Sequence, residues 1–263
     1  MNPAAHPERN HHLVESLFPV GTFTLAEALE QLRGGRVAAV GAEVAAAMDR
    51  ATDELTGTHS PAGMPAVGGA APRFELADQN GTVIALDDLR AAGPVVVVFY
   101  RGAWCPFCSV TLRAYQQLLP ELRALGADLV AISLQVPDGS LTTAERNHLT
   151  YHVLSDVGGA VSRAYGLIFR VPGHLETVYR ELGLSLPELN GTDDWELPVP
   201  ASFVIDRGGT VRFAEALPDY MRRSNPAEVL AVVREISAEG TEQMLQHKVF
   251  RTPGGEDGSG ASS

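Results

Sequence analysis

Two cysteines separated by two residues are the side chains of this sequence best suited to chemistry. Cys105 and Cys108 lie in the stretch Y-R-G-A-W-C-P-F-C, and the chain contains no other cysteine. A C-x-x-C pair is typical of dithiol–disulfide chemistry, and it also supplies half of the ligands of a zinc site. The elements around the pair, and the other possible ligands, distinguish these two interpretations.

The pair follows a predicted buried strand and opens a predicted helix. Residues 95–99 (V-V-V-V-F) are apolar and mostly β-branched, which is typical of a strand covered on both faces. Apolar residues then recur at helical spacing up to Gly126, which is placed as a helix C-cap glycine. Pro106 suits the first helical position, where a missing N–H is no loss. Cys105 is therefore predicted at the start of the helix.

A thiolate at a helix N-terminus is stabilised by free N–H groups and by the helix dipole. We therefore expect Cys105 to have a lowered pKa and to react first. Cys108 lies one helical turn later, near enough to form a disulfide with Cys105. A zinc site would need two more ligands, and His148 and His152 are spaced for one helix face. Because their separation from the cysteines is far longer than in a zinc finger, we expect a redox pair and no metal.

The bulk composition narrows the class of protein. The chain has 263 residues, 45% of them hydrophobic, and a formal net charge of −12, which argues against a nucleic-acid or anionic-membrane partner. The one lysine, Lys248, excludes a lysine-based phosphate loop or Schiff base in the core. The start of the chain lacks the pattern of a signal peptide, and no apolar run has membrane-spanning length. We expect a cytoplasmic protein.

The hydrophobic pattern predicts three segments. Residues 1–66 form an N-terminal helical extension and linker that packs on the core or on a second copy of the chain in a homodimer. Residues 67–238 form one α/β domain, and residues 239–263 form a largely disordered tail. In the extension, helices are predicted over 25–32 and 37–55, before a Gly/Pro-rich linker over 56–71.

Within the domain, strands alternate with helices, and two hairpins make the predicted sheet a mixed one. The predicted strands span residues 74–77, 82–86, 95–99, 128–134, 153–154, 201–205 and 210–215. The predicted helices span 87–90, 106–125, 142–151 with Thr142 or Thr143 as N-cap, 159–165, and 226–236 with Asn225 as N-cap. Residues 167–198 are interpreted as an insertion without strong periodicity.

Three blocks of the sequence resemble a known family. They are V-G-G-A-A-P-R-F-E-L-A-D-Q-N-G-T-V-I-A-L-D-D-L, V-V-V-V-F-Y-R-G-A-W-C-P-F-C and V-P-A-S-F-V-I-D-R-G-G-T-V-R-F. In this order they are similar to peroxiredoxin-like proteins of the AhpC/TSA group, in the thioredoxin-fold superfamily. The resemblance covers residues 67–236. It implies a thioredoxin-like fold, in which helices cover both faces of a central mixed sheet and a redox cysteine begins the helix after the first core strand.

The active-site segment of peroxiredoxins, P-x-x-x-[T/S]-x-x-C, can be aligned here in two registers. Without a gap, Arg101 takes the proline position, Cys105 the threonine, and Cys108 the peroxidatic cysteine. With a gap, Cys105 and Pro106 fall on the family's Cys-Pro, which keeps the reactive thiol at the helix start, so we favour Cys105. The arginine that peroxiredoxins place before the strand resembling A-S-F-V-I-D is replaced by Pro200. This proline matches the cis-proline that faces the C-x-x-C of thioredoxins.

The resemblance implies a thiol-dependent peroxidase that reduces hydrogen peroxide or organic hydroperoxides through Cys105 and Cys108. A thioredoxin or glutathione-type reductant would recycle the pair, without a metal or organic cofactor. Trp104, at the site surface in thioredoxin-like proteins, and Arg101, in place of the missing arginine, are expected to support the site together with Pro106 and Pro200. His174 is expected in a loop, outside the chemistry.

Two other functions are compatible with the same cysteines. A thioredoxin-like dithiol–disulfide oxidoreductase would act on protein disulfides, and Arg101 and Pro200 favour this alternative because they depart from the peroxidase pattern. A redox-sensing module would instead use its disulfide to change a partner contact through the N-terminal helices.

Overall fold

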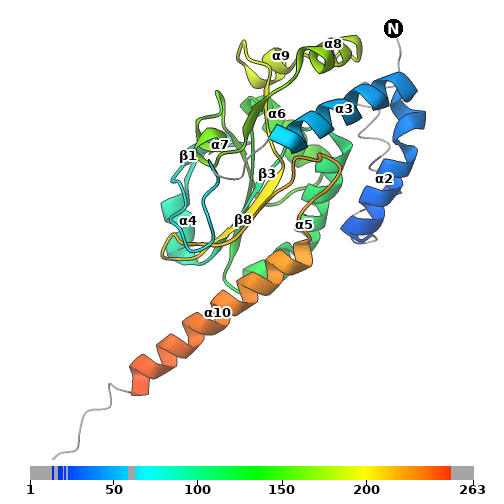
Figure 1. Cartoon of the computed structure of the whole chain (residues 1–263). Helices are drawn as coiled ribbons and strands as arrows, with labels where there is room; N and C mark the ends of the chain where they lie inside the picture. Colours follow the sequence, from blue (N-terminus) through cyan, green and yellow to red (C-terminus); the bar gives the residue numbers. More distant parts are fainter. Residues whose placement is uncertain (1–13, 15–16, 20, 22, 59–62, 250–263) are drawn as a thin grey trace, which may run out of the picture.

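A seven-stranded mixed sheet forms the centre of the computed structural model, which describes residues 14, 17–19, 21, 23–58 and 63–249 (Figure 1). The strand order is β2-β1-β5-β4-β3-β8-β9. Strands β3, β4 and β5 are parallel, and the remaining neighbours are antiparallel. The strands are β1 Glu75–Asp78, β2 Val83–Ala85, β3 Val95–Phe99, β4 Asp128–Ser133, β5 His152–Ser155, β8 Ala201–Ile205 and β9 Val211–Ala216.

The central strands are buried on both faces, as their continuous apolar runs predict. Successive side chains of β3 point to opposite faces, so Val96 and Val98 join one core, and Val95, Val97 and Phe99 join the other. Both cores extend to the carboxyl end of β3, where the chain turns toward the two cysteines. This end of the sheet is therefore a rigid support for the site.

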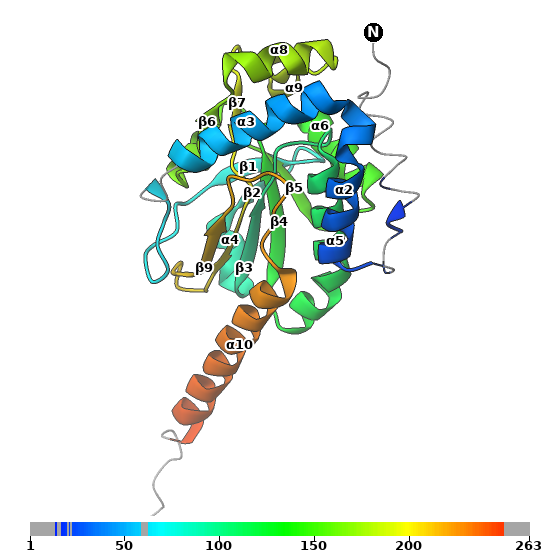
Figure 2. The same cartoon turned by 45° about the vertical axis from the view of Figure 1, so that its right-hand side comes forward.

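Helices cover both faces of the sheet, which confirms the expected thioredoxin-like architecture (Figure 2). One face carries α5 (Pro106–Ala124), α6 (Pro137–Arg146) and α10 (Pro226–Val249), and the other carries α4 (Leu86–Ala92) and α7 (Ala160–Ala164). Helix α5 ends as predicted, because Gly126 has φ +76° and its N–H donates to the Arg123 carbonyl.

The predicted N-terminal extension is helical and packs on the core. Helix α2 (Leu25–Val40) lies along α5, and α3 (Ala42–Thr58) crosses to α8 (Gly173–Glu181). A capping box of Thr24 and Glu27 starts α2. The predicted helices over 25–32 and 37–55 divide the extension at the wrong place, because α2 runs on to Val40 and the break falls at Gly41, with φ +90°, before α3. The boundary at residues 66 and 67 remains a prediction.

The segment 167–198 has more regular structure than predicted. It contains a two-stranded antiparallel sheet, with two helices in the connection. These elements are β6 Ile168–Arg170, α8 Gly173–Glu181, α9 Leu186–Asn190 and β7 Glu196–Pro198. Each is too short for sequence periodicity to identify, although Leu175 and Tyr179 have the i, i+4 spacing of one buried helix face.

Two helix boundaries also differ from the prediction. Helix α6 starts at Pro137, so Thr142 and Thr143 lie inside it rather than at its N-cap. Helix α10 starts at Pro226 with Asn225 accepting from the Ala227 N–H, as expected, but it continues past Ile236 to Val249. Residues 237–249 include many good helix formers and no proline, which explains the extension. The predicted tail from 239 therefore begins within a helix, and residues 250–263 lie outside the described part.

No helix in the described part of the chain is both long and apolar enough to cross a membrane.

Candidate active site

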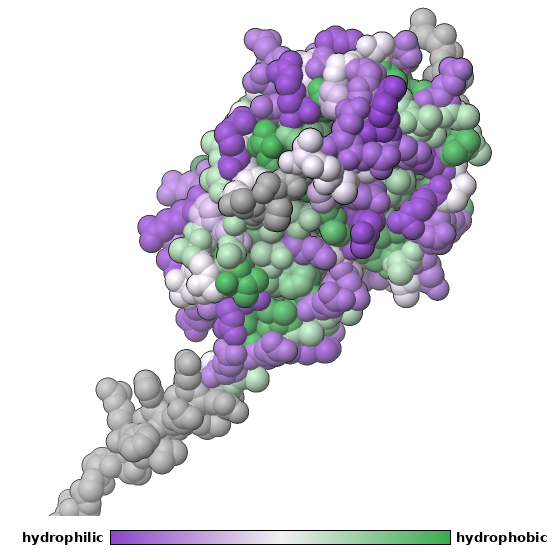
Figure 3. Space-filling view, in the orientation of Figure 1, coloured by the Kyte–Doolittle hydropathy of each residue, from purple (hydrophilic) through white to green (hydrophobic). Residues whose placement is uncertain are grey.

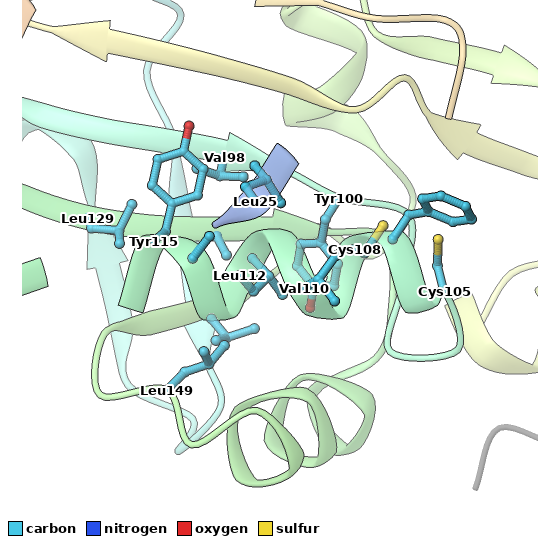
Figure 4. Packing of buried hydrophobic residues seen from close by; sticks show 14 of the residues in the cluster. Leu25, Val98, Tyr100, Cys105, Cys108, Val110, Leu112, Tyr115, Leu129 and Leu149 are labelled. Atoms are coloured by element: carbon cyan, nitrogen blue, oxygen red, sulfur yellow. The ribbon is translucent and has the colours of Figure 1, made fainter. Parts of the chain in front are cut away.

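The turn from β3 into α5 places both cysteines at the helix start, as predicted (Figure 4). Cys105 is the N-cap residue in an extended conformation, and Pro106 occupies the first turn. The backbone N–H of Cys108 donates to the Cys105 carbonyl at 3.0 Å, which fixes the second thiol one turn along the helix. Both side chains are buried, with 2% of Cys105 and 1% of Cys108 exposed.

The loop before the cysteines is held by a glycine and a glutamine. Gly102 has φ +154°, and a Cβ at this position would lie 2.4 Å from Nε1 of Trp104. The Ala103 N–H donates to Oε1 of Gln135 at 2.6 Å, which ties the loop to the end of β4. A larger residue at Gly102 would displace Trp104 from its position beside Cys105.

Cys108 has the contacts that stabilise a thiolate. Its sulfur accepts the Arg101 backbone N–H at 3.4 Å and Nη2 of Arg223 at 3.3 Å. Burial opposes ionisation of Cys108, but the hydrogen bond from Cys105 and the charges of Arg223 and Arg101 outweigh it. Together they hold the pKa of Cys108 well below its ordinary value.

The surroundings of Cys105 favour its protonated form. Burial, followed by its hydrogen bond to Cys108, raises the pKa of Cys105 well above the ordinary value. The prediction of a lowered pKa for Cys105 is therefore wrong for the resting pair. As an N-cap residue it makes no side-chain capping bond, so the helix N–H groups do not stabilise its thiolate directly.

Arg101 is a buried cation at the site rather than a surface charge. Its guanidinium donates to the Tyr179 hydroxyl and lies 4.8 Å from the ring centroid of Trp104 and 4.6 Å from that of Tyr220. The titratable groups that act on Arg101 are tyrosines and the two cysteines, and its Nε has no hydrogen-bond partner among the described residues. A buried N–H without a partner is costly, which makes it available to an acceptor on a ligand.

A cavity of about 470 Å³ adjoins the pair. Cys105 lines it, together with Arg101, Trp104, Pro106 and Tyr179, whereas Cys108 lies behind and does not. The Trp104 ring packs edge-on against Tyr179 at 5.7 Å, so this predicted site residue is buried at the site instead of lying on its surface. Burial raises the pKa of Tyr179, which keeps its hydroxyl protonated. A molecule in the cavity therefore meets Cys105, two arginines (Arg101 and Arg36) and two tyrosines (Tyr179 and Tyr220).

Pro200 does not have the predicted role. The described residues contain no cis peptide bond, so Val199–Pro200 is trans. The Val199 N–H donates to the Leu167 carbonyl and the Pro200 carbonyl accepts from Leu217, which keeps the chain extended between β7 and β8. Pro200 lines a smaller second cavity that shares Arg101, Tyr179 and Tyr220 with the first but does not include Cys105.

His148 and His152, the possible zinc ligands considered from the sequence, are not arranged to bind a metal together. His152 lies in β5, where its Nδ1 contacts Oδ2 of Asp78 at 2.9 Å. His148 follows α6 with φ +52°, so the two do not share a helix face as predicted. His174 lies in the first turn of α8, not in a loop, and it does not line the cavity. The described residues hold no group of three or more histidine, cysteine or acidic residues that could bind a metal.

Sequence reasoning missed the residues that complete the site from distant segments. Arg223 contacts Cys108 across 115 positions, and Tyr179 contacts Arg101 across 78. Tyr220 packs edge-on against Phe107 at 5.5 Å. Neither local periodicity nor spacing indicates such contacts. The one available signal is the pair Arg222–Arg223 just before α10, because an arginine is the residue that the peroxiredoxin pattern lacks at Pro200.

The chain is similar in sequence and fold to several known proteins. Alkyl hydroperoxide reductase E of Mycobacterium tuberculosis is 31% identical over 151 residues, which are 57% of this chain and 84% of that protein. Thiol-disulfide oxidoreductase ResA of Bacillus cereus is 24% identical over 168 residues, 61% of this chain and 79% of that protein. The crystal structure of peroxidoxin BcpB from Mycobacterium tuberculosis superposes with a TM-score of 0.53 and 27% identity, covering 66% of this chain and 98% of that one.

The family itself follows from the extent of the match. The sequence model of the AhpC/TSA family matches residues 67–214, which is more than half of the chain and includes β3, both cysteines and β8. The N-terminal helices α2 and α3 precede the matched region. On this match, together with the mixed sheet and the position of the cysteines, the chain belongs to the AhpC/TSA family.

Proposed function

We propose that the protein is a thiol-dependent peroxidase, an oxidoreductase that reduces hydrogen peroxide or organic hydroperoxides through Cys105 and Cys108. The observation that carries the proposal is geometric: Cys105 lines a cavity beside Arg101, and the Cys108 sulfur behind it accepts from the Arg101 backbone N–H and from the Arg223 guanidinium. The peroxidase names of its relatives support the same reaction.

In the first step Cys105 attacks the peroxide, because its sulfur lines the cavity. Cys108 takes the proton of Cys105, and the Cys105 thiolate then attacks the terminal oxygen of the hydroperoxide. The S–O bond forms as the O–O bond breaks, and the leaving alkoxide takes the proton back from Cys108. Cys105 becomes a sulfenic acid, the hydroperoxide becomes an alcohol, and Cys108 is again a thiolate. Arg101 and Tyr179 donate hydrogen bonds to the oxygens during this step.

In the second step the Cys108 thiolate attacks the sulfur of the Cys105 sulfenic acid. Hydroxide leaves and is protonated to water, and a Cys105–Cys108 disulfide remains. A thioredoxin or glutathione-type dithiol or thiol supplies the two electrons that restore the pair. The proposal needs no metal or organic cofactor, and it places the protein in the cytoplasm, where the pair is returned to the reduced state. A homodimer is compatible with this scheme.

The supporting residues have separate roles in this proposal. Trp104 holds the Arg101 guanidinium in place by a cation–π contact, and Pro106 starts the helix without an N–H that would compete for the site. Pro200 supports Arg101 from the neighbouring cavity instead of facing Cys105.

Reduction of protein disulfides is the second candidate function. The C-x-x-C pair and the similarity to ResA favour it. The cavity beside Cys105 favours a hydroperoxide as the oxidising substrate, because its volume of about 470 Å³ suits a small molecule.

The two candidates predict different activities for the purified protein. With dithiothreitol as reductant, we expect cumene hydroperoxide to be consumed about 10²- to 10³-fold faster than by an equal concentration of free cysteine, because Arg101 and Tyr179 stabilise the developing charge. Reduction of insulin disulfides, followed by turbidity, should stay near the rate without protein. The opposite pattern would support the disulfide oxidoreductase and exclude our proposal.

Oxidation is expected to produce a disulfide within one chain. One equivalent of hydroperoxide should leave the protein at monomer size on a non-reducing gel, and mass spectrometry should find a loss of about two mass units per chain. The residue pair is fixed because Cys105 and Cys108 are the only cysteines. A predominantly crosslinked dimer would contradict the second step.

A further inference from the structure

The cavity beside Cys105 has one wall that comes from outside the family-matched region. Helix α2 contributes Leu32, Arg36 and Ala39, and α3 contributes Met48. The family match begins at residue 67, after both helices. The space in front of the reactive sulfur is therefore built partly by a segment that this chain adds to the family domain.

This wall is fixed to the rest of the molecule. Leu25, Ala28, Leu29 and Leu32 of α2 are buried in the same apolar core as α5. Arg36 joins the two helices through its Nη2, 2.6 Å from Oδ1 of Asp49. The outer surfaces over α3 and α8 are mostly hydrophilic, so the apolar side chains of the extension face inward (Figure 3). Helices attached in this way can hold a ligand in a defined position.

The lining of the cavity specifies a ligand with an apolar body and one polar end. The added helices supply Leu32, Val40 and Met48, and Leu184 lies in the segment after α8. Their polar lining residues are Gln31 and Arg36, and the Arg36 charge is paired with Asp49. At the opposite side lie Cys105 and the unpaired Nε of Arg101. A volume of about 470 Å³ exceeds the needs of hydrogen peroxide and falls within the range for organic ligands.

We propose that α2 and α3 form the substrate-specificity wall of the site and select hydroperoxides that carry a bulky apolar group. The peroxide end lies at Cys105 and Arg101, and the apolar group lies against Leu32, Ala39 and Met48. This proposal rests on the peroxidase function proposed above. It assigns the N-terminal extension a role in substrate choice, rather than in redox sensing or dimer formation.

A substitution that fills the cavity tests this role. Ala39→Phe places a ring in the cavity, and Ala46→Phe is the matched control, because Ala46 is exposed on α3 and does not line the cavity. We expect Ala39→Phe to lower kcat/KM for cumene hydroperoxide about tenfold or more relative to its effect on kcat/KM for hydrogen peroxide. Ala46→Phe should leave the ratio of the two values unchanged. An unchanged ratio in Ala39→Phe, or a loss confined to the step with the thiol reductant, would overturn the proposal.

A binding measurement separates this proposal from the peroxidase function and from misfolding. The alcohol product of cumene hydroperoxide, 2-phenyl-2-propanol, should slow alkylation of Cys105 by iodoacetamide in the wild type and in Ala46→Phe, with the label located by peptide mapping. Protection should be lost in Ala39→Phe, whose circular dichroism spectrum should match that of the wild type. Protection without peroxide turnover would refute the peroxidase function alone. Turnover without protection would refute the role of the wall alone.

Discussion

Replacing Cys105 by serine should abolish hydroperoxide turnover, with a loss of at least about 10³-fold in kcat/KM. The serine hydroxyl would still line the cavity and adjoin Arg101, but it is a far weaker nucleophile than a thiolate at neutral pH. The Cys108 thiolate would remain, held by Arg223 behind the cavity wall. The measurement is peroxide consumption with excess dithiothreitol, together with trapping by dimedone after a single addition of hydroperoxide.

The companion variant Cys108→Ser separates the two sulfurs. It should lose multiple turnover but retain one attack, and it should accumulate a Cys105 sulfenic acid that dimedone traps. The pKa of Cys105 should fall in this variant, because the competing thiolate is gone while Arg101 and Arg223 remain. If Cys105→Ser instead accumulates a sulfenic acid on Cys108, the ungapped register is correct and the cavity-facing sulfur is only the resolving one.

Arg223→Gln should raise the pKa of the Cys108 thiol. The guanidinium stabilises the charged form of Cys108, so its removal favours the protonated form. At a pH below both pKa values the variant should therefore be about 10- to 100-fold slower than the wild type. The difference should disappear at a pH above both values, where each protein carries the thiolate.

Absorbance of the thiolate at 240 nm against pH measures this shift independently of turnover. Arg222→Gln is the matched control, since Arg222 is exposed and its side chain makes no described contact with Cys108. Arg222→Gln removes one positive charge, as Arg223→Gln does, but from the neighbouring position. An equal pKa shift in both variants would show a general charge effect and would remove the specific role of Arg223.

Local signals in the sequence predicted the support of the site correctly. The run V-V-V-V-F, the helical spacing after Pro106 and the cap at Gly126 each depend on neighbours within a few positions, and all three were confirmed. The mixed sheet was predicted from the alternation of strands with helices and from the two hairpins, and it was confirmed. Regular structure in residues 167–198 was missed because its two helices have nine and five residues and its two strands have three each.

The electrostatics of the site required contacts that local reasoning cannot supply. Position at a helix N-terminus predicts a low pKa for Cys105, but the hydrogen bonds from Arg101 and Arg223 reverse the order of the two thiols. The resemblance to thioredoxin implied a cis-proline at Pro200, whereas hydrogen bonds on either side keep the chain extended there. The pKa order of the two cysteines and the conformation at Pro200 both depend on contacts with residues that are distant in the sequence.

The arginines beside Cys108 also have a consequence for the energy of electron transfer. Forming the disulfide removes the negative charge from the pair, but the positive charges of Arg101 and Arg223 remain, and Arg101 is buried. A buried cation without a counter-ion is unfavourable, so the surroundings stabilise the reduced pair more than the oxidised one. A couple whose reduced form is stabilised has a higher reduction potential. The protein should therefore act as a comparatively strong oxidant of its thiol partner, and each disulfide formed by peroxide should be reduced readily to begin the next cycle.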